Sequence, residues 1–418
     1  MKSEIVNKIN LINKGKIPEG YKKTEKSKII PREWQIKKFD ECIEITKGQV
    51  NPNINPYCKM IHIGLANIEK LTGRLLYTNL ANEEDLTSSK YYFDKDTVLY
   101  GKIRPELGKV LYANFEGICS ADIYPLKTLH NLKAKYLKYI LLDNKFYKFT
   151  VRSSMRTGMP KINREDLSTY VFTIPTINEQ EKISEILDTW DKLIELKEML
   201  IKEKQKNKKG LMERLLTGKV RLKGFNDKWN RIKLDKLIEE SKEKSIENNQ
   251  HNILSVTKEG IYLQSEYFNR QIASKDNIGY KVVRKNNLVF STMNLWMGSI
   301  DILNKYDIGI VSPACKVFYL NEELVDISFM KYFIKSSYMM NLYSLNSEQG
   351  ASIVRRNLDL KGLLSTNVRL PNIDEQKKIG EILGISSREI DLLEKEVELL
   401  KYQKKGIMQL LLTGIVRV

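Results

Sequence analysis

The chain has 418 residues, 42% of them hydrophobic and 29% charged, so it is long enough for two globular domains and lacks a composition typical of disorder. Its 70 Lys and Arg residues outnumber its 52 Asp and Glu residues, giving a net charge of +18 and a pI near 9.4. This excess favours a nucleic-acid partner, although a Lys-rich composition alone would produce the same charge.

The sequence gives no sign of a membrane segment, a disulfide framework or a metal site. No run of 18 apolar residues occurs, and the first ten residues lack the apolar core of a signal peptide. The spacing of Cys42, Cys58, Cys119 and Cys315 forms no disulfide framework, so we expect a reducing, cytoplasmic location. Cys58 and His62 could form half of a zinc site, but no second pair completes it, and no metal is expected.

In chain order we expect an N-terminal arm over residues 1–30, a first globular domain over 31–174 and a long helix over 175–222. A second globular domain over 223–370 and a second long helix over 371–418 follow. Each globular domain is predicted to be α+β, because short β-branched and aromatic runs alternate with turn residues and helical periodicity. The expected strands are 60–65, 97–100, 109–112, 288–291 and 316–320, and the expected helices are 135–149 and 327–342.

The long helices are predicted from an internal repeat. Residues 174–222 and 370–418 align without a gap, and 22 of 49 positions are identical. After Pro175 or Pro371, each copy has a polar turn in which Asn178 or Asp374 is expected to cap the helix, and each ends in Leu-Leu-Thr-Gly, a helix stop signal. Between these signals, residues recur at alternating spacings of four and three, as in a coiled-coil seam. The predicted apolar seam is Ile183, Leu187, Trp190, Ile194, Ile201, Leu211, Leu215, Ile379, Leu383, Ile390, Leu393, Val397, Leu400, Ile407 and Leu411.

Two matched seams in one chain favour an antiparallel intramolecular coiled coil with pseudo-two-fold symmetry over two separate surface helices. A run of 38 residues, from Glu179 to Leu216, is about 57 Å of helix at about 1.5 Å per residue. Such a spacer would hold the globular domains apart. Helices of this length would separate the two domains by more than one turn of DNA, which is about 34–36 Å.

Several segments follow one another as in a known family. They are Trp34–Phe39 at the entry of the first domain, Lys102–Lys109, Met159–Arg164 before the first long helix, and Glu179–Ile183 within it. With the duplicated helix and the Leu-Leu-Thr-Gly endings, they resemble the specificity subunits of type I restriction–modification enzymes over essentially the whole chain. The second domain departs from the pattern at Asn294–Met297, and Gly350–Arg356 is longer than its first-domain counterpart.

The resemblance implies two target recognition domains, each of which reads half of a split double-stranded DNA sequence. The paired helices would act as a spacer and bind two methyltransferase subunits, and restriction subunits would complete the complex. AdoMet, ATP and Mg²⁺ would bind to the partner subunits, so this chain would be non-catalytic and would hold no cofactor.

The sequence contains no recognisable catalytic motif. It has no Asn-Pro-Pro-aromatic motif, P-loop, GxGxxG, GxSxG or HExxH sequence. Two alternatives remain open. The chain could be a self-contained DNA methyltransferase or endonuclease, or an architectural coiled-coil adaptor that does not contact DNA.

Candidate DNA-contacting residues carry the donors and acceptors that can bind base edges or phosphates. The loops over Arg152–Gly158 and Ser347–Arg356 are the preferred candidates, because they are polar and contain Arg. The candidates are Lys102, Arg104, Lys109, Arg152, Arg156, Lys161 and Arg164 in the first domain, and Arg270, Lys275, Lys281, Asn294, Arg355 and Arg356 in the second.

Overall fold

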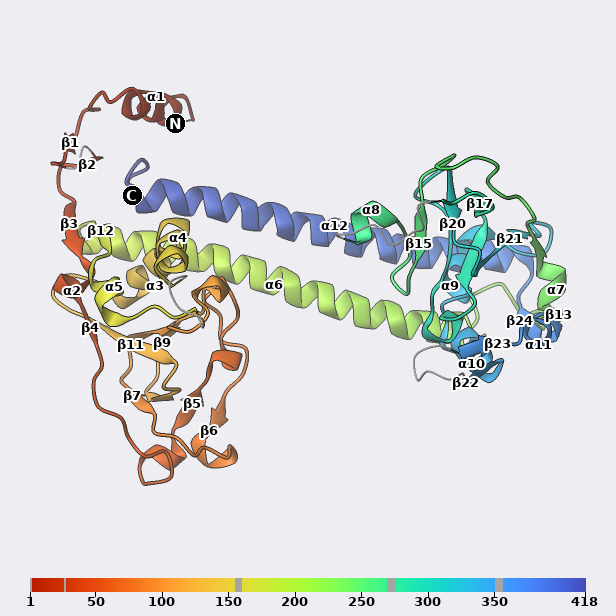
Figure 1. Ribbon diagram of the computed structural model, residues 1–418, viewed down its shortest axis with the longest axis horizontal. Helices are drawn as coiled ribbons and strands as arrows, with labels where there is room; N and C mark the ends of the chain where they lie inside the picture. Colours follow the sequence, from red (N-terminus) through yellow and green to blue (C-terminus); the bar gives the residue numbers. More distant parts are fainter. Residues whose placement is uncertain (1, 26–27, 155–159, 269–275, 350–355) are drawn as a thin grey trace. The chain divides into compact units, whose positions relative to one another are not determined.

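The computed structural model describes the whole chain except residues 1, 26–27, 155–159, 269–275 and 350–355 (Figure 1). The chain divides into two compact units. Unit 1 comprises Met1–Lys197 with Glu396–Val418, and unit 2 comprises Glu198–Lys395. Each unit therefore contains one globular domain together with a part of each long helix.

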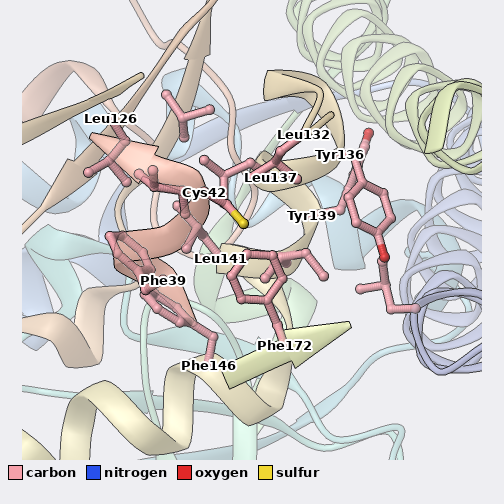
Figure 2. Packing of buried hydrophobic residues seen from close by; sticks show 14 of the residues in the cluster. Phe39, Cys42, Leu126, Leu132, Tyr136, Leu137, Tyr139, Leu141, Phe146 and Phe172 are labelled. Atoms are coloured by element: carbon pink, nitrogen blue, oxygen red, sulfur yellow. The ribbon is translucent and has the colours of Figure 1, made fainter. Parts of the chain in front are cut away.

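The domain of unit 1 is built on an antiparallel sheet with the strand order β4-β11-β8-β9. Its strands are β4 (Ile43–Ile45), β8 (Thr97–Gly101), β9 (Val110–Ala113) and β11 (Ile123–Thr128). Every residue of β8 is buried, because the sheet is covered on both faces. Helices α3 (Ala134–Leu142) and α4 (Asn144–Ser154) pack on one face. Figure 2 shows part of this core, including Phe39, Phe146 and Phe172.

A second sheet, in the order β6-β5-β10-β7, covers the other face. Its strands are β5 (Ile61–Ile63), β6 (Asn79–Leu80), β7 (Tyr91–Phe93) and β10 (Gly117–Cys119), and only the pair β5–β10 among them is parallel. Ile63 and Phe93 from this sheet pack with Leu99 and Leu111 from the first. A two-stranded ladder of β3 (Gln35–Lys38) and β12 (Val171–Ile174) joins the beginning and the end of the domain.

Shorter elements complete unit 1. An N-terminal helix and a two-stranded ladder precede the domain, and single helical turns connect several strands. These elements are α1 (Lys2–Asn13), β1 (Tyr21–Lys23), β2 (Ile29–Pro31), α2 (Phe39–Cys42), η1 (Tyr57–Lys59), η2 (Leu65–Asn67), η3 (Ala81–Glu83), η4 (Pro105–Leu107) and α5 (Arg164–Ser168).

The domain of unit 2 repeats the first sheet in the same connectivity, as β14-β21-β18-β19. The second sheet is reduced to the pairs β15-β16 and β17-β20, and β13–β24 repeats the ladder that joins the two ends of the domain. The strands are β13 (Asn230–Lys233), β14 (Ile238–Glu240), β15 (Leu254–Val256), β16 (Ile261–Leu263), β17 (Lys281–Arg284), β18 (Leu288–Ser291), β19 (Ile300–Ile302), β20 (Ile308–Val311), β21 (Cys315–Leu320), β22 (Ser347–Gln349), β23 (Arg356–Leu358) and β24 (Asn367–Leu370). The helices are α7 (Leu234–Leu237), α8 (Gln264–Tyr267), η5 (Leu295–Met297), α9 (Ile327–Phe333), α10 (Ser337–Leu345) and α11 (Leu360–Ser365).

The predicted α+β class and all five predicted strands are confirmed, with shifts of one or two residues at some strand ends. The two predicted domain helices are wrong in one respect, because each is a pair of helices. The first pair is separated at Asp143, whose backbone is extended. The second pair is separated near Ser336, whose side chain accepts a hydrogen bond from the amide of Met339 and so caps a new helix.

The two long helices are α6 (Ile177–Leu215) and α12 (Ile373–Leu412). Within each unit they run antiparallel. In unit 1, Lys197 near the middle of α6 pairs with Glu396 at 2.8 Å, and Asp191 pairs with Lys404 nearer the end of α12. In unit 2, Lys204 pairs with Glu389 at 2.6 Å.

All fifteen predicted seam residues are buried or partly buried. Burial of a large apolar side chain contributes roughly 1.5–3 kcal/mol to the free energy of unfolding when it is complete, so the seam stabilises the helix pair. Near the helix ends the seam packs on the domain cores, since Ile183 and Leu411 belong to the core of unit 1 and Ile379 and Leu215 to that of unit 2. Ile183, Leu187, Ile194, Ile201, Leu215, Ile379, Leu383, Ile390, Val397 and Leu411 are buried, and Trp190, Leu211, Leu393, Leu400 and Ile407 are partly buried.

Candidate nucleic-acid interface

The chain brings four of the predicted basic residues of unit 1 together beyond the end of β8. The amide of Ile162 donates to the carbonyl of Lys102 at 3.0 Å, and the amide of Arg104 donates to the carbonyl of Pro160 at 2.8 Å. These bonds join the segment 102–104 to the segment 160–162 and place Lys161 beside it. We call Lys102, Arg104, Lys161 and Arg164 the basic corner of unit 1.

Two members of this corner have structural contacts. The Arg164 guanidinium donates to the carbonyls of Ile45 at 3.2 Å and Thr46 at 3.0 Å and lies 5.3 Å from the ring centre of Tyr124. The ammonium of Lys102 lies 5.0 Å from the same ring. Burial lowers the pKa of Lys102, and the nearby charge of Lys161 lowers it further. These contacts fix the corner and concentrate positive charge there.

Arg104 is an exposed member of this corner. Its side chain is 62% exposed, and its only described partner is Glu106, whose carboxylate lies 3.0 Å from Nε. An exposed ion pair of this kind contributes little stability and is readily exchanged for a phosphate or a base. Its backbone has φ of +52°, a left-handed conformation that is uncommon for a residue other than glycine. Strain of this type is found at functional positions.

The other two described candidates of unit 1 differ in accessibility. The ammonium of Lys109 donates to the carbonyl of Ile68, and burial lowers the pKa of Lys109. Arg152 is exposed and lies in the last turn of α4, where a cation interacts favourably with the helix dipole. The prediction of a loop beginning at Arg152 is therefore wrong at its start, because α4 continues to Ser154. Arg156 lies outside the described residues.

Unit 2 forms a different corner at the corresponding place. Strand β18 ends at Ser291, and the carbonyl of Asn294 accepts hydrogen bonds from the amides of Met297 and Ser299. No hydrogen bond is found for the Asn294 side-chain amide among the described residues. The Arg356 guanidinium lies 4.2 Å from the ring centre of Trp296, close enough for a strong cation–π contact. We call Asn294, Trp296 and Arg356 the Trp–Arg corner.

The remaining candidates of unit 2 contribute less. The ammonium of Lys281 lies 3.6 Å from the carboxylate of Glu240, which also pairs with Lys316. Burial lowers the pKa of Lys281. The predicted polar loop at 347–350 is wrong in part, because Ser347–Gln349 forms strand β22, paired with β23. Extended pairing satisfies backbone groups that a loop would leave to solvent. Arg270, Lys275 and Arg355 lie outside the described residues.

The Glu-Gln pair at the start of each long helix has a role that sequence reasoning missed. Asn178 and Asp374 lie within the helices, and Asn372 caps α12 by accepting from the amide of Glu375 at 2.9 Å. The capping prediction is therefore wrong for both Asn178 and Asp374. The Glu-Gln pair stands at the same place in both repeats, and this was the one sequence signal of a shared structural role. In the structure, all four side chains are buried.

Each buried Gln joins its helix to the adjoining domain through the same three hydrogen bonds. In unit 1, the Gln180 amide nitrogen donates to the carbonyls of Asn131 at 2.8 Å and Pro175 at 3.0 Å. Its oxygen accepts from the amide of Lys133 at 2.9 Å. Gln376 makes the equivalent bonds in unit 2. Its amide nitrogen donates to the carbonyls of Leu324 and Pro371, and its oxygen accepts from the amide of Asp326.

Each buried Glu binds an Arg that follows the opposite long helix. In unit 1, Glu179 accepts from Arg417 at 2.5 and 3.0 Å and from the indole nitrogen of Trp34 at 2.8 Å. In unit 2, Glu375 accepts from Arg221 at 2.8 and 2.6 Å. The indole nitrogen of Trp229, the counterpart of Trp34, is buried without a described partner. The two Arg–Glu–Trp clusters are thus similar but not identical.

The glycines of the two Leu-Leu-Thr-Gly sequences terminate the helices as predicted. Gly218 and Gly414 have φ near +70°, which favours glycine. A side chain on Gly414 would lie within 2.6 Å of Pro31, and one on Gly218 would approach Trp229 to 3.3 Å. Each helix end thus lies close to a Trp, Gly414 to Trp34 and Gly218 to Trp229, and this close approach also favours glycine at both positions.

Among the described residues, no group of three or more His, Cys, Asp or Glu side chains could hold a metal ion. The Cys58 thiol donates a hydrogen bond to the side-chain oxygen of Asn55, whereas the His62 ring nitrogen Nδ1 lies at hydrogen-bond distance from the Glu84 carboxylate. All four cysteines are free. The search of these same residues for a helix that could cross a membrane found none.

Comparison with known proteins finds similarity to the specificity subunits of type I restriction enzymes. Residues 31–205 match the type I restriction modification DNA specificity domain. The Escherichia coli type I restriction enzyme EcoDI specificity subunit is 34% identical over 154 residues, 37% of this chain and about a third (34%) of that protein's length. A putative type I restriction enzyme MjaX specificity subunit from Methanocaldococcus jannaschii is 27% identical over 96% of this chain and 97% of its own.

Solved structures agree on the fold. A chain from a structural study of the complex assembly and conformational transition of the type I restriction–modification system aligns with a TM-score of 0.59 at 14% identity, covering 93% of this chain and 99% of its own. The S subunit from M. genitalium aligns with a TM-score of 0.52 at 16% identity, covering 91% of this chain and 96% of its own. With its duplicated long helices and its two domains of one framework, this chain is similar to type I restriction–modification specificity subunits over almost its whole length.

Proposed function

We propose that this chain is the sequence-reading subunit of a type I restriction–modification complex, and that it directs methylation and cleavage by partner subunits at a bipartite DNA site. The observation that carries the proposal is the pairing of a repeated framework with two different corners. The Gln180 and Gln376 attachments match bond for bond, whereas Arg104 in one corner is replaced by Asn294 in the other.

The chemistry of the two corners supports separate readings of DNA. Arg binds guanine bidentately through O6 and N7, and Asn binds adenine through N6 and N7. The exposed Arg104 and the Asn294 amide, which has no hydrogen-bond partner among the described residues, have these properties, while Lys102 and Lys161 provide charge for phosphates. Each domain would thus read its own short half-site, and the bases between the half-sites would be unread.

Exposed apolar side chains on the long helices support protein partners. On α12, Leu392 is 65% exposed, and on the same helix Tyr402 is 77% exposed. On α6, Leu196 is 53% exposed. Large apolar groups in water on a helix favour association with apolar surfaces of another protein. We assign these residues to the binding of two methyltransferase subunits. AdoMet, ATP and Mg²⁺ are assigned to the methyltransferase and restriction subunits.

The test is methylation by the chain alone and with its methyltransferase. The purified chain should show no methyltransferase, ATPase or nuclease activity, and the complex should methylate one defined bipartite sequence, read by methylome sequencing of host DNA. Turnover by the isolated chain that survives repurification would favour the self-contained enzyme. Absence of DNA binding at every concentration of a salt series would favour the architectural adaptor, since a protein that contacts phosphates binds DNA more tightly as the salt concentration falls.

A second test concerns the long helices as a spacer. Inserting one matched heptad into each, near Ile201 and near Val397, retains the seam register and lengthens each helix by about 10 Å. The unread gap should then grow by roughly 3 bp while both half-sites stay the same. Methylation at the original gap with full efficiency would show that the helices do not set the distance.

A further inference from the structure

One acidic cluster of unit 1 has no acidic counterpart in unit 2. In unit 1, the hydroxyl of Tyr139 donates to Asp188 at 2.5 Å and to Asp191 at 2.8 Å. Lys138 lies 3.3 Å from Asp188 and 3.4 Å from Asp191, and Lys404 also pairs with Asp191. Tyr139 lies on the side of the core that faces the long helices (Figure 2). Lys135 also lies 3.8 Å from Asp188, so two carboxylates pair with three lysines around one tyrosine.

The repeat retains two of these lysines in unit 2 but removes both carboxylates. At the offset of 196 residues, Lys404 corresponds to Lys208, whereas Asp188 and Asp191 correspond to Gly384 and Ser387. Tyr332 takes the place of Tyr139, and its hydroxyl lies 2.8 Å from the Ser387 hydroxyl. The Lys208 ammonium lies 5.5 Å from the Tyr332 ring centre. Lys331 precedes Tyr332 as Lys138 precedes Tyr139.

A cavity of about 470 Å³ lies beside these residues, within unit 2. Lys208, Lys331, Lys335, Tyr332 and Ser387 line it from the helices α6, α9 and α12 and the turn after α9, and the loop after β19 lines it opposite. The lining is therefore polar and contains several amino groups that point to a common space. Its size is sufficient for a phosphate group with a substituent.

The balance of charge in this cavity is positive. Of the carboxylates that line it, Asp301 pairs with Lys335 at 2.9 Å and Glu259 pairs with Lys258 at 3.6 Å. Asp391 is exposed and lies near Lys208, whose pKa is lowered mainly by burial. No ion pair is found for Lys331 among the described residues.

We propose that this cavity binds a phosphate-bearing anion, with Lys208 and Lys331 supplying positive charge beside the Tyr332 hydroxyl. The anion could come from a free phosphate or phosphate ester, or from the DNA backbone, since all present the same oxygens. The site is separate from the Trp–Arg corner, and its binding of free phosphate does not depend on the proposed reading of DNA.

The test transfers the acidic pair of unit 1 into unit 2. The Gly384→Asp and Ser387→Asp double variant places two carboxylates where unit 1 has Asp188 and Asp191. The nearest atom to a side chain at Gly384 is the Tyr332 hydroxyl at 4.0 Å, so there is room for it. Removal of a glycine from the middle of a helix also favours folding. The Gly384→Asn and Ser387→Asn double variant is the matched neutral control.

The probes are inorganic phosphate and pyrophosphate, titrated calorimetrically into the full chain at constant ionic strength. The unaltered chain and the Asn control should bind, and the Asp variant should bind at least about tenfold more weakly, because two negative charges oppose the anion at short range. Equal loss in the Asn and Asp variants would overturn the proposal, since charge would then not be the cause. Circular dichroism checks that all three proteins are folded.

A second arm identifies a DNA source. Binding of duplex DNA is measured over a salt series for the same three proteins. If the cavity holds a backbone phosphate, the Asp variant should release about one counterion fewer, whereas the Asn control should not differ. A change in this arm alone supports the DNA source, and a change in the first arm alone supports a free anion. No difference in either arm, or a defect confined to assembly with protein partners, would overturn the proposal.

Discussion

The two globular domains of this chain are alike where they meet the long helices and differ at the two corners that we propose contact DNA. Gln180 and Gln376 make the same three hydrogen bonds, although 196 residues separate them. By contrast, the exposed Arg104 corresponds to Asn294, and the Trp296–Arg356 contact has no equivalent in the basic corner of unit 1. The residues that attach each domain to its long helix are therefore separate from those proposed to recognise DNA.

The physical reason lies in burial. A buried amide such as that of Gln180 must have all its hydrogen-bonding atoms paired, and any other side chain would leave partners unsatisfied. An exposed side chain such as Arg104 can be replaced without such a cost, because water satisfies it in the free protein. The buried attachment residues can thus stay the same in both domains while the exposed residues proposed to contact DNA differ. Such a difference would let each domain recognise its own half-site.

The largest expected effect comes from exchanging a whole globular domain. Replacing Trp34–Asn163 by the matching segment of a relative should change one half of the methylated sequence and leave the other half unchanged. The affinity of the variant for DNA that carries the original half-site should fall by roughly three orders of magnitude or more. Methylome sequencing measures both halves in one experiment.

The control for this exchange is the reverse replacement in unit 2, which should alter only the other half. A relative's segment must keep a Trp at position 34, since Trp34 donates to Glu179. If either exchange changed both half-sequences, the two domains would not read DNA independently.

Next in size are the two buried carboxylates. Glu179→Ala leaves Arg417 and the indole of Trp34 without their shared acceptor, and Glu375→Ala leaves Arg221 without one. Removing one partner of a buried ion pair costs about 3–5 kcal/mol of unfolding free energy. We expect the loss to be larger for Glu179, because the Trp229 indole already lacks a described partner.

Urea unfolding of the two variants, followed separately in each unit by hydrogen exchange, measures this difference. The Glu181→Ala variant is a control, since its pair with Lys133 is at the surface, with both side chains about half exposed. Equal destabilisation by Glu179→Ala and Glu375→Ala would show that the Trp34 bond contributes nothing. Destabilisation by Glu181→Ala of the same size would contradict the importance of burial.

The sequence predicted the domain order, the α+β class and the helix pair, because repeats and periodicity depend on local pattern. Gly218 and Gly414 were also predictable, since a glycine after an apolar helical run is a local stop signal. The buried state of Glu179 was not predictable. Its binding partner Arg417 lies 238 residues away, and a Glu in the first turn is equally typical of a solvated helix end.

The candidate interface was predicted only in part for the same reason. Lys109 and Arg164 look like any basic surface residues in sequence, but they donate to the carbonyls of Ile68, Ile45 and Thr46 within the fold. The split of residues 135–149 into two helices depends on one extended residue, Asp143, inside an otherwise helical pattern. Tertiary contacts decide both cases, and periodicity does not report them.

A smaller effect separates the two reading corners. Arg104→Ala should weaken binding at one base pair of its half-site by about 1–3 kcal/mol and relax the preference there. Asn294→Ala should do the same in the other half-site only. Competition binding with singly substituted duplexes measures both. Lys161→Ala serves as the comparison, since loss of a phosphate contact should lower affinity for all sequences equally. A uniform loss in Arg104→Ala would assign it to phosphate contact.

The smallest expected effect is a difference in pH response between the units, and it arises from one residue. His62 in β5 pairs with Ile118 in the parallel ladder, and Ile253 pairs with Ile310 in the same way in unit 2. The Nδ1 atom of His62 lies 2.7 Å from Glu84, while Nε2 is buried without a described partner. Burial lowers the pKa of His62, and it outweighs the opposing effect of Glu84.

The sign of the effect follows from this lowered pKa. Below the ordinary His value near 6.5, the unfolded chain takes up a proton that folded unit 1 does not, so acidification through that range favours unfolding of unit 1. Above it, neither state is protonated at this residue and the difference disappears. Hydrogen exchange of Gly117–Cys119, corrected for intrinsic rates, should therefore quicken between pH 7.5 and 5.5 more than that of Ile308–Val311. In His62→Gln, which cannot titrate, the excess should vanish. An excess that persists in this variant would assign the pH response to another group, and equal quickening of both strands would remove the contrast between the units.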